Sequence, residues 1–193
     1  MKLAYKKYIL AEADATLFDI LEKKFPQASL IKGDAARADF KKQIEDDWIC
    51  VGNLPYNAAA PIMTHVVREV PRPRQCVFMI QKEQADRVCA EPGDMSMLSL
   101  AVQLYGEARR LFVVAPGCFT PPPNVDSAVI EIIPFQDTDK EENENILSFA
   151  KNAFQHRRKQ VRKTLGGTPE QKEMIQNALN DMELPEDIRP QVL

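Results

Sequence analysis

Short apolar runs alternate with amphipathic stretches along most of the chain. The apolar runs stop at turn-forming or polar residues and predict strands at residues 8–12, 29–32, 48–54, 76–80, 111–114 and 128–133. Between them, apolar positions recur at helical spacing and predict helices at residues 15–24, 58–69, 82–90 and 96–105. Strands and helices that alternate in this way favour βαβ units and a mainly parallel sheet. The last two strands are joined by a loop alone, which favours an antiparallel ending.

The pattern changes after Pro134. Residues 137–145 read DTDKEENEN, which is an acidic and polar linker. Further helices are predicted at about 144–165 and at 169–181. We therefore expect two domains, an α/β domain over residues 1–136 and a small helical domain over residues 137–193.

Charge is distributed unevenly along the chain. With 25 Lys and Arg against 28 Asp and Glu, the formal net charge of −3 argues against a nucleic-acid partner. Residues 151–163, KNAFQHRRKQVRK, nevertheless carry six Lys and Arg side chains and no acid. A local basic stripe matters more to a polyphosphate ligand than total charge does, so this segment predicts contact with nucleic acid. A solvated basic helix is the alternative.

Membrane and metal classes find no support in the composition. The sequence has no run of eighteen apolar residues, and its N-terminus reaches acidic residues too soon for a signal peptide, so we expect a cytoplasmic protein. The four cysteines are irregularly spaced and are accompanied by only two histidines, which argues against zinc sites and disulfides. Cys50 and Cys76 lie in apolar runs and are expected to be buried free thiols.

The tetrapeptide Asn53-Leu54-Pro55-Tyr56 stands where a predicted strand ends and a helix begins. In open α/β sheets, ligands bind outside the carboxyl ends of the strands. The amino group of adenine is a poor nucleophile because its lone pair is delocalised into the ring. An Asn oxygen and a backbone carbonyl can accept its two hydrogens and so favour the reactive, pyramidal nitrogen. Pro55 restrains the backbone and Tyr56 offers a ring on which a base can stack. A turn with a half-buried tyrosine is the alternative.

This tetrapeptide resembles the amino-methyltransferase motif in which Asn, Asp or Ser is followed by Pro or Leu, then by Pro and an aromatic residue. Its NLPY form is similar to that of the ribosomal RNA adenine N6-dimethyltransferases. Three further segments resemble motifs of that family in the same order: FMIQKE at 78–83 with Arg87, FTPPPNVDSAV at 119–129, and AFQHRRK at 153–159 with Arg162 and Leu165. The family's fold, a Rossmann-like class I methyltransferase sheet followed by a small helical domain, is therefore the expected α/β architecture.

The resemblance assigns the residues that bind the target base. Tyr56 and Phe119 would stack on the two faces of an adenine flipped out of its helix, while Asn53, Leu54 and Pro55 form the catalytic turn. Stacking contributes about 1–3 kcal/mol per base, which offsets a similar cost of unstacking. Ordinary core packing is the alternative for Phe119.

The resemblance also implies a site for S-adenosyl-L-methionine. Glu12, with Ala13 beside it, ends the strand where the family places an acid on the ribose hydroxyls of this cofactor. Asp34, with Ala35, matches the acid that receives the cofactor's adenine amino group, and Asn53 completes the site. Solvated strand ends are the alternative for both acids. No metal is implied.

A basic helix of the family contacts RNA, and four residues match it. Their side chains fit phosphate contacts along an RNA helix that is read by shape. They are Arg157, Arg158, Lys159 and Arg162. The roles of Gln81, Lys82 and Glu83 stay open between positioning a loop near the site and serving only the core and surface.

The chain departs from the family at its start. The family's E-x-G-x-G-x-G loop, which lets the backbone approach the methionine part of the cofactor, should precede Tyr8 and is absent, and Gly33 and Gly52 stand alone. In the family, the strand before this loop lies between the strands that end here at Glu12 and Leu54. We therefore expect a gap in the sheet with unpaired backbone groups on both sides, and a fragment that also lacks the family's last helix.

The expected function is S-adenosylmethionine-dependent dimethylation of adenine N6 in small-subunit ribosomal RNA, during ribosome maturation. A monomer acting on the immature small ribosomal subunit is expected. The second reading is a non-catalytic rRNA-binding or ribosome-assembly factor, or an inactive fragment; the missing glycine loop favours it, whereas Glu12, Asp34 and Asn53 oppose it. A DNA adenine methylase fits the proline-rich loop and basic helix poorly. The methylase of large-subunit rRNA is a close enzymatic relative.

Overall fold

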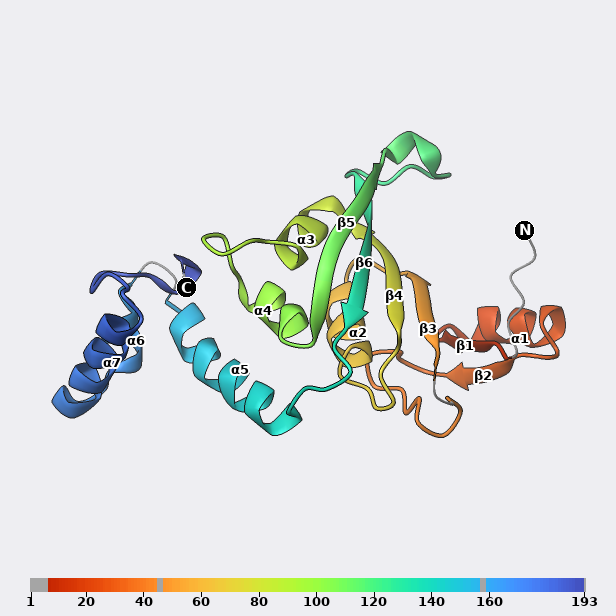
Figure 1. The fold of residues 1–193 in the computed structure, drawn as a ribbon. Coiled ribbons are helices and arrows are strands. Elements are labelled where there is room, and N and C mark those ends of the chain that lie inside the picture. Colours follow the sequence, from red (N-terminus) through yellow and green to blue (C-terminus); the bar gives the residue numbers. More distant parts are fainter. Residues whose placement is uncertain (1–6, 45–46, 157–158, 193) are drawn as a thin grey trace.

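The computed structural model describes residues 7–44, 47–156 and 159–192. Strands and helices alternate up to the last strand, and helices follow it (Figure 1). The strands are β1 Ile9–Glu12, β2 Ser29–Lys32, β3 Ile49–Asn53, β4 Gln75–Gln81, β5 Gly106–Val114 and β6 Ser127–Pro134. The helices are α1 Ala15–Lys24, α2 Ala59–Val66, α3 Lys82–Val88, α4 Met97–Gln103, α5 Lys140–Phe154, α6 Val161–Leu165 and α7 Pro169–Asp181, with the 3-10 turns η1 Pro116–Cys118 and η2 Pro190–Val192.

The strands form two separate sheets. β1 and β2 form a parallel pair, and the larger sheet has the order β3-β4-β6-β5. In the larger sheet β3 and β4 are parallel, whereas β6 is antiparallel to both β4 and β5. The predicted α/β fold with an antiparallel ending is therefore confirmed.

Among the described residues, β1 and β3 are edge strands of their two sheets. In the part of the chain that the structure describes, β1 pairs with β2 alone and β3 with β4 alone. Val51, at the middle of β3, is 70% exposed. One row of backbone N–H and C=O groups on β3 consequently has no strand partner there, which agrees with the gap expected from the sequence.

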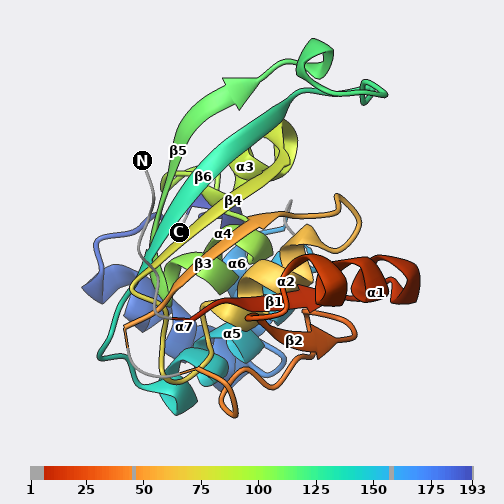
Figure 2. The same ribbon diagram turned by 90° about the vertical axis from the view of Figure 1, so that its right-hand side faces the viewer.

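The main core lies on one face of the larger sheet. Cys76, Phe78 and Ile80 alternate along β4 and are fully buried, because alternate residues of a strand point to the same face. Helices α2, α3 and α4 lie against this face (Figure 2). Burial raises the pKa of the Cys76 thiol, and that of the half-buried Cys50 to about 12. Both are free thiols, as predicted, but only Cys76 is buried as expected.

β5 is longer than the apolar pattern predicts. It begins at Gly106 instead of residue 111. Its polar stretch Glu-Ala-Arg-Arg pairs with β6, where Arg109 stands opposite Glu131 and forms an ion pair with it. A Cβ on Gly106 would lie 2.7 Å from the carbonyl oxygen of Ile133, so the close approach of the two strands requires glycine. Cross-strand pairing thus extends the strand over a segment without apolar alternation.

The helices after β6 surround a second, smaller core. Asp139 caps α5 by accepting hydrogen bonds from the backbone N–H groups of Glu141 and Glu142. The second core contains Val161 of α6, Leu179 of α7 and Ile188 near the C-terminal end. The domain boundary placed at residue 136 stays a prediction.

The single helix predicted at about 144–165 is wrong. α5 begins at Lys140 and ends at Phe154, and α6 begins at Val161. The backbone N–H of Val161 donates to the carbonyl of Ile188 at 2.9 Å. The break turns the chain so that Val161 enters the second core, and a straight helix would carry it past that core.

A polar cluster marks the other face of the larger sheet. Glu131 is 6% exposed and accepts hydrogen bonds from Arg109 Nε and Gln75 Nε2. The Arg109 hydrogen bond, followed by that of Gln75, holds the pKa of Glu131 below its usual range, because both donors favour the charged carboxylate.

This lowered pKa predicts how stability depends on pH. Glu131 contributes stability above its unfolded-state pKa, and the contribution is lost as pH falls through the folded-state value. We expect Glu131→Gln to lower the free energy of unfolding at neutral pH and to reduce its pH dependence over the acidic range. Urea unfolding at a series of pH values measures this. Glu107→Gln, at an exposed position of β5, is the control, and an equal loss at every pH would contradict the prediction.

The open edge of β3 is the surface through which the monomer would associate at high concentration. Because an unpaired apolar edge pairs readily with another chain, Val51→Lys should lower concentration-dependent association. Its cost in stability should stay within about 0.5 kcal/mol, as for exposed sites generally. Sedimentation velocity over a concentration series measures the association. Val125→Lys, at an exposed valine outside the sheet edge, should leave it unchanged, and an equal effect of both substitutions would count against the edge.

Candidate functional site

The tetrapeptide 53–56 forms a tight turn at the carboxyl end of β3. Leu54 is buried and its backbone N–H donates to the carbonyl of Met79 at 3.0 Å. A Cβ on Gly52 would lie 2.7 Å from Leu54 Cδ2, so glycine leaves the space into which Leu54 folds back. Because Leu54 points inward, Asn53 remains exposed at the end of the strand.

Tyr56 is held by hydrogen bonds to both its side-chain hydroxyl and its backbone carbonyl. Its hydroxyl forms a 2.7 Å hydrogen bond with Oγ of Ser127, the first residue of β6. Its backbone carbonyl accepts from Gln84 Nε2 of α3 at 3.2 Å. The ring is half-buried. Three elements, β3, α3 and β6, therefore hold one aromatic ring beside Asn53.

Phe119 lies in the loop that projects from the body between β5 and β6 (Figures 1 and 2). The 3-10 turn η1 leads into it, and the Phe119 N–H donates to the carbonyl of Pro116 at 3.1 Å. Phe119 is half-buried, and its ring does not pack against that of Tyr56. The loop ends at Ser127, the partner of Tyr56, so its base is joined directly to the NLPY turn.

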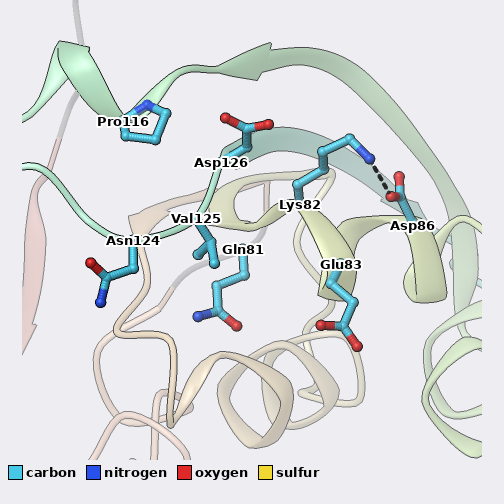
Figure 3. Close-up of a pocket in the computed structure, with 8 residues that line it drawn as sticks. All are labelled: Gln81, Lys82, Glu83, Asp86, Pro116, Asn124, Val125 and Asp126. Atoms are coloured by element: carbon cyan, nitrogen blue, oxygen red, sulfur yellow. Dashed lines mark hydrogen bonds and ion pairs between the residues drawn. The ribbon is translucent and has the colours of Figure 1, made fainter.

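An open pocket of about 490 Å³ lies between this loop and the start of α3 (Figure 3). Lys82 N–H donates to the carbonyl of Asp126 at 2.9 Å, and Lys82 Nζ lies 2.8 Å from Asp86. The Lys82 hydrogen bond holds the pKa of Asp86 below its usual range, with Arg110 contributing further. The pocket is lined by Gln81, Lys82, Glu83, Asp86, Pro116, Asn124, Val125 and Asp126. The FMIQKE segment thus supplies a wall of this pocket.

Glu12 and Asp34 lie at the carboxyl ends of the adjacent strands β1 and β2. Oε1 of Glu12 accepts from the N–H groups of Ala13 and Asp14, at 2.8 and 2.9 Å. Oδ1 of Asp34 accepts from Ala36 N–H at 2.9 Å. Each carboxylate is anchored to the backbone through one oxygen, and the other oxygen can accept from hydroxyl or amino groups of a ligand. In Asp34 this second oxygen lies 4.0 Å from Arg37 Nε, in an exposed ion pair that a ligand would have to displace or share.

This arrangement fits part of the implied cofactor. Anchored acids at two strand ends suit the ribose and adenine of S-adenosylmethionine, and Ala35 packs against the main core beside them. No glycine-rich run stands anywhere in the sequence to approach the methionine end, since Gly33 and Gly52 are isolated.

The structure brings the predicted residues together in two groups. Asn53, Leu54, Pro55, Tyr56 and Phe119 belong to the larger sheet and its loops, whereas Glu12, Ala13, Asp34 and Ala35 belong to the β1–β2 pair. No hydrogen bond or ion pair joins the two groups in the described part of the chain.

The predicted RNA-binding residues are only partly described. Arg157 and Arg158 lie outside the described residues. Lys159 is exposed. Arg162 is half-buried and donates from Nη1 to Gln176 Oε1 of α7 at 3.0 Å, so part of its hydrogen-bonding capacity serves the helical domain.

Sequence reasoning did not single out two residues that hold Tyr56. Ser127 lies within the family-like segment FTPPPNVDSAV but was given no role of its own, and Gln84 was visible only as one polar residue of a predicted helix. The signal available in the sequence was a hydroxyl-bearing residue at the start of an apolar run that follows a proline-rich segment.

Two absences apply to the described residues 7–44, 47–156 and 159–192. No cluster of three His, Cys, Asp or Glu side chains is placed to hold a metal ion there. None of the helices in these ranges has the length and apolar character needed to cross a membrane.

Comparison with known sequences identifies a family. A model described as ribosomal RNA adenine dimethylase matches residues 1–191. The ribosomal RNA small subunit methyltransferase A of Pseudomonas aeruginosa is 38% identical over 163 residues, covering 80% of this chain and 61% of that protein. Its namesake from Fusobacterium nucleatum is 32% identical over 191 residues, 95% and 72% of the two chains. The chain spans about three fifths of the length of the first relative.

Solved structures show the same fold. A dimethyladenosine transferase from Plasmodium falciparum gives a TM-score of 0.76 at 22% identity, over 97% of this chain and 78% of that one. The 23S rRNA methyltransferase ErmE gives 0.69 at 20% identity, over 97% and 79%. These likenesses confirm the predicted Rossmann-like architecture.

The hydrogen bond between Tyr56 and Ser127 predicts an energetic coupling. We expect Ser127→Ala and Tyr56→Phe each to lower the free energy of unfolding by about 1 kcal/mol, because each leaves one partner without its hydrogen bond. The double substitution should cost clearly less than the sum of the two. Chemical denaturation of the four proteins gives the cycle, and strictly additive losses would mean that the two hydroxyls do not interact.

Proposed function

We propose that this chain, which belongs to the ribosomal RNA adenine dimethylase family, binds a flipped adenine of small-subunit ribosomal RNA and supports transfer of methyl groups to its amino group. The observation that carries the proposal is the anchoring of Tyr56 by Ser127 and Gln84 next to the exposed Asn53. The two relatives named as small subunit methyltransferases support the choice of the small-subunit RNA.

The turn at Asn53 would orient the amino group for attack. The side-chain oxygen of Asn53 accepts one hydrogen, and the backbone carbonyl of Leu54 accepts the other, since that of Pro55 already accepts from Ala58 N–H. Two acceptors draw the nitrogen towards a pyramidal geometry and leave its lone pair directed outward. Catalysis here rests on positioning and needs no strong base.

The aromatic residues would hold the base in the turn. Tyr56 is prevented from rotating away by its two hydrogen bonds, and Phe119 is carried on a loop stiffened by three consecutive prolines. Stacking on such rings contributes about 1–3 kcal/mol per base. Flipping a base out of its helix costs a similar amount, about a few kcal/mol, so the stacking gain offsets this cost.

S-adenosyl-L-methionine is the proposed donor and would supply an electrophilic methyl group. Glu12 would accept from the ribose hydroxyls and Asp34 from the adenine amino group, each through the carboxylate oxygen that does not bind the chain's own backbone. Ala13 and Ala35 would leave room beside these acids, and Asn53 would complete the cofactor site.

The helical segment would contact RNA phosphates. Lys151, Lys159 and Lys163 are exposed, and together with Arg162 they form a basic stripe for an RNA helix read by its shape. Arg157 and Arg158 belong to the same stretch of sequence. A methyltransferase domain over residues 1–136, an RNA-binding domain over residues 137–193, and a cytoplasmic monomer acting on the immature small subunit complete the proposal.

A non-catalytic RNA-binding factor is the second candidate. It is favoured by one observation: β1 and β3 are not paired within the described residues, so the acids and the NLPY turn stand on separate sheets. A protein of this kind would bind the base and the RNA helix without holding the donor in register with them.

Methyl transfer tests the proposal directly. With labelled S-adenosylmethionine and immature small ribosomal subunits, Asn53→Ala should lower the rate of transfer about a hundredfold, the usual effect of removing one hydrogen bond that orients a reacting group. Asn57→Ala, an exposed asparagine in the same loop, is the matched control and should leave the rate unchanged.

The same assay separates the two candidate functions. Methyl transfer by the unmodified chain, lowered about a hundredfold by Asn53→Ala, supports the enzyme. Retained binding to the subunits without any transfer, and without binding of S-adenosylmethionine in calorimetry, would reject the enzyme in favour of the RNA-binding factor.

A further inference from the structure

A buried arginine fastens the segment that leaves the α/β domain. Arg72 lies between α2 and β4 and is only 9% exposed. Its Nη1 donates to the carbonyls of Phe135 and Gln136, at 3.0 and 2.9 Å. These carbonyls follow β6 and lie outside any helix or strand. One guanidinium group therefore binds the connection at the point where it departs from the sheet.

Tyr105 joins the same cluster to α5. It is fully buried, and its hydroxyl donates to Glu144 Oε1 at 3.1 Å. Arg68 lies 5.1 Å from the ring centroid and bonds the same Glu144 oxygen at 3.2 Å, while Arg72 lies 6.0 Å from the centroid. Asn143, one residue earlier, donates to the carbonyl of Leu104 at 3.0 Å. Burial raises the pKa of Tyr105, so its hydroxyl stays a donor.

We call the group Arg68, Arg72, Tyr105, Asn143 and Glu144 the Arg72 clamp. It acts on a helix that spans two cores. Leu147 of α5 belongs to the main core. Further along, α5 contacts α6 and η2 of the second core, and Ala150 and Ala153 on this stretch are buried. Whatever fixes the start of α5 therefore fixes where the helical domain lies.

The clamp is built for direction more than for stability. Arg72 has no carboxylate within ion-pair distance among the described residues, and its buried Nε has no hydrogen-bond partner there. A buried cation that is incompletely satisfied costs free energy compared with an apolar side chain of similar size. Apolar packing buries a helix but allows it to slide, whereas hydrogen bonds weaken as their donor and acceptor move out of line and so favour a narrow range of helix orientations.

We propose that the Arg72 clamp is the positioning device that sets the orientation of α5, and so places the basic stripe at the distance from Asn53 and Tyr56 that lets one RNA reach both. The inference rests on the proposed function. Two weak contacts on one RNA reinforce each other only when their geometry permits simultaneous binding. Arg72 and Tyr105 are therefore positioning residues that touch neither the base nor the phosphates.

Two conservative variants test the clamp. Arg72→Lys keeps the charge but loses the forked donors, and Tyr105→Phe keeps the ring but loses the bond to Glu144. Arg74→Lys is the matched control. Arg74 lies two residues after Arg72, in the same segment between α2 and β4, but it is exposed and pairs with Asp47 at 3.1 Å. A spin-label pair at Glu91→Cys and Glu173→Cys, with the exposed Cys118 replaced by Ser, reports the distance between the α/β and helical domains by pulsed electron paramagnetic resonance.

Binding to two RNA probes gives the functional readout. A tetra-adenylate reaches only the NLPY turn, whereas a stem-loop with an adenine-rich loop also reaches the basic stripe. The two clamp variants should broaden the distance distribution and weaken stem-loop binding by at least about tenfold. They should leave tetra-adenylate binding unchanged, and Arg74→Lys should alter neither.

Other outcomes overturn the inference. An unchanged distance distribution, or an equal loss for both probes, would mean that the cluster serves general stability only. If the unmodified protein binds neither probe, the proposed function fails, while the distance measurement still decides whether the clamp orients α5.

Discussion

The burial of β4 between β3 and β6 is the constraint on which the rest of the structure depends. One face of the strand excludes water under α2, α3 and α4. Its backbone register sets Asn53 beside Met79 on one side and Ser127 beside Gln81 on the other. The end of β3, the start of α3 and the start of β6 therefore meet at one end of the sheet. This is the carboxyl end of the parallel strands, where an α/β fold places its ligands.

Hydrogen bonds at this end of the sheet hold the residues of the candidate site together. The bond from Tyr56 to Ser127 joins β3 to β6, and that from Gln84 to the Tyr56 carbonyl joins α3 to both. In the ion pair of Lys82 with Asp86, both side chains are 41% exposed, so the pair contributes little to stability. Its place in the pocket wall matters more than its energy. Gln81, Lys82 and Glu83, whose roles the sequence left open, line the pocket beside the NLPY turn.

Buried polar groups have a different role in the connection between the two cores. Arg72 is only 9% exposed and Tyr105 is fully buried, and away from water an unpaired polar atom is costly and a paired one is held firmly. Such groups specify geometry because few arrangements satisfy them. This gives α5 a defined direction, although the helix itself is amphipathic and could pack at several angles.

Local signals predicted local structure well. Asp14 and Phe25-Pro26 delimit α1 at the predicted residues, and the apolar run at 29–32 is β2. The roles assigned to Glu12, Asp34, Asn53 and Phe119 stay predictions. The pattern failed where distant partners intervene. β5 extends over Arg109 because Glu131 stands opposite, and the helix at 144–165 breaks because Val161 turns towards Ile188.

By itself, the sequence determined the order of strands and helices, the family and the chemistry offered by the NLPY turn, because caps, apolar periodicity and short motifs are properties of neighbouring residues. Only the tertiary structure decided that Tyr56 is held by a serine 71 positions away, and that Arg72 binds carbonyls 63 and 64 positions away. Such contacts depend on strand register and helix packing. Those are settled by the whole fold at once, and no local pattern encodes them.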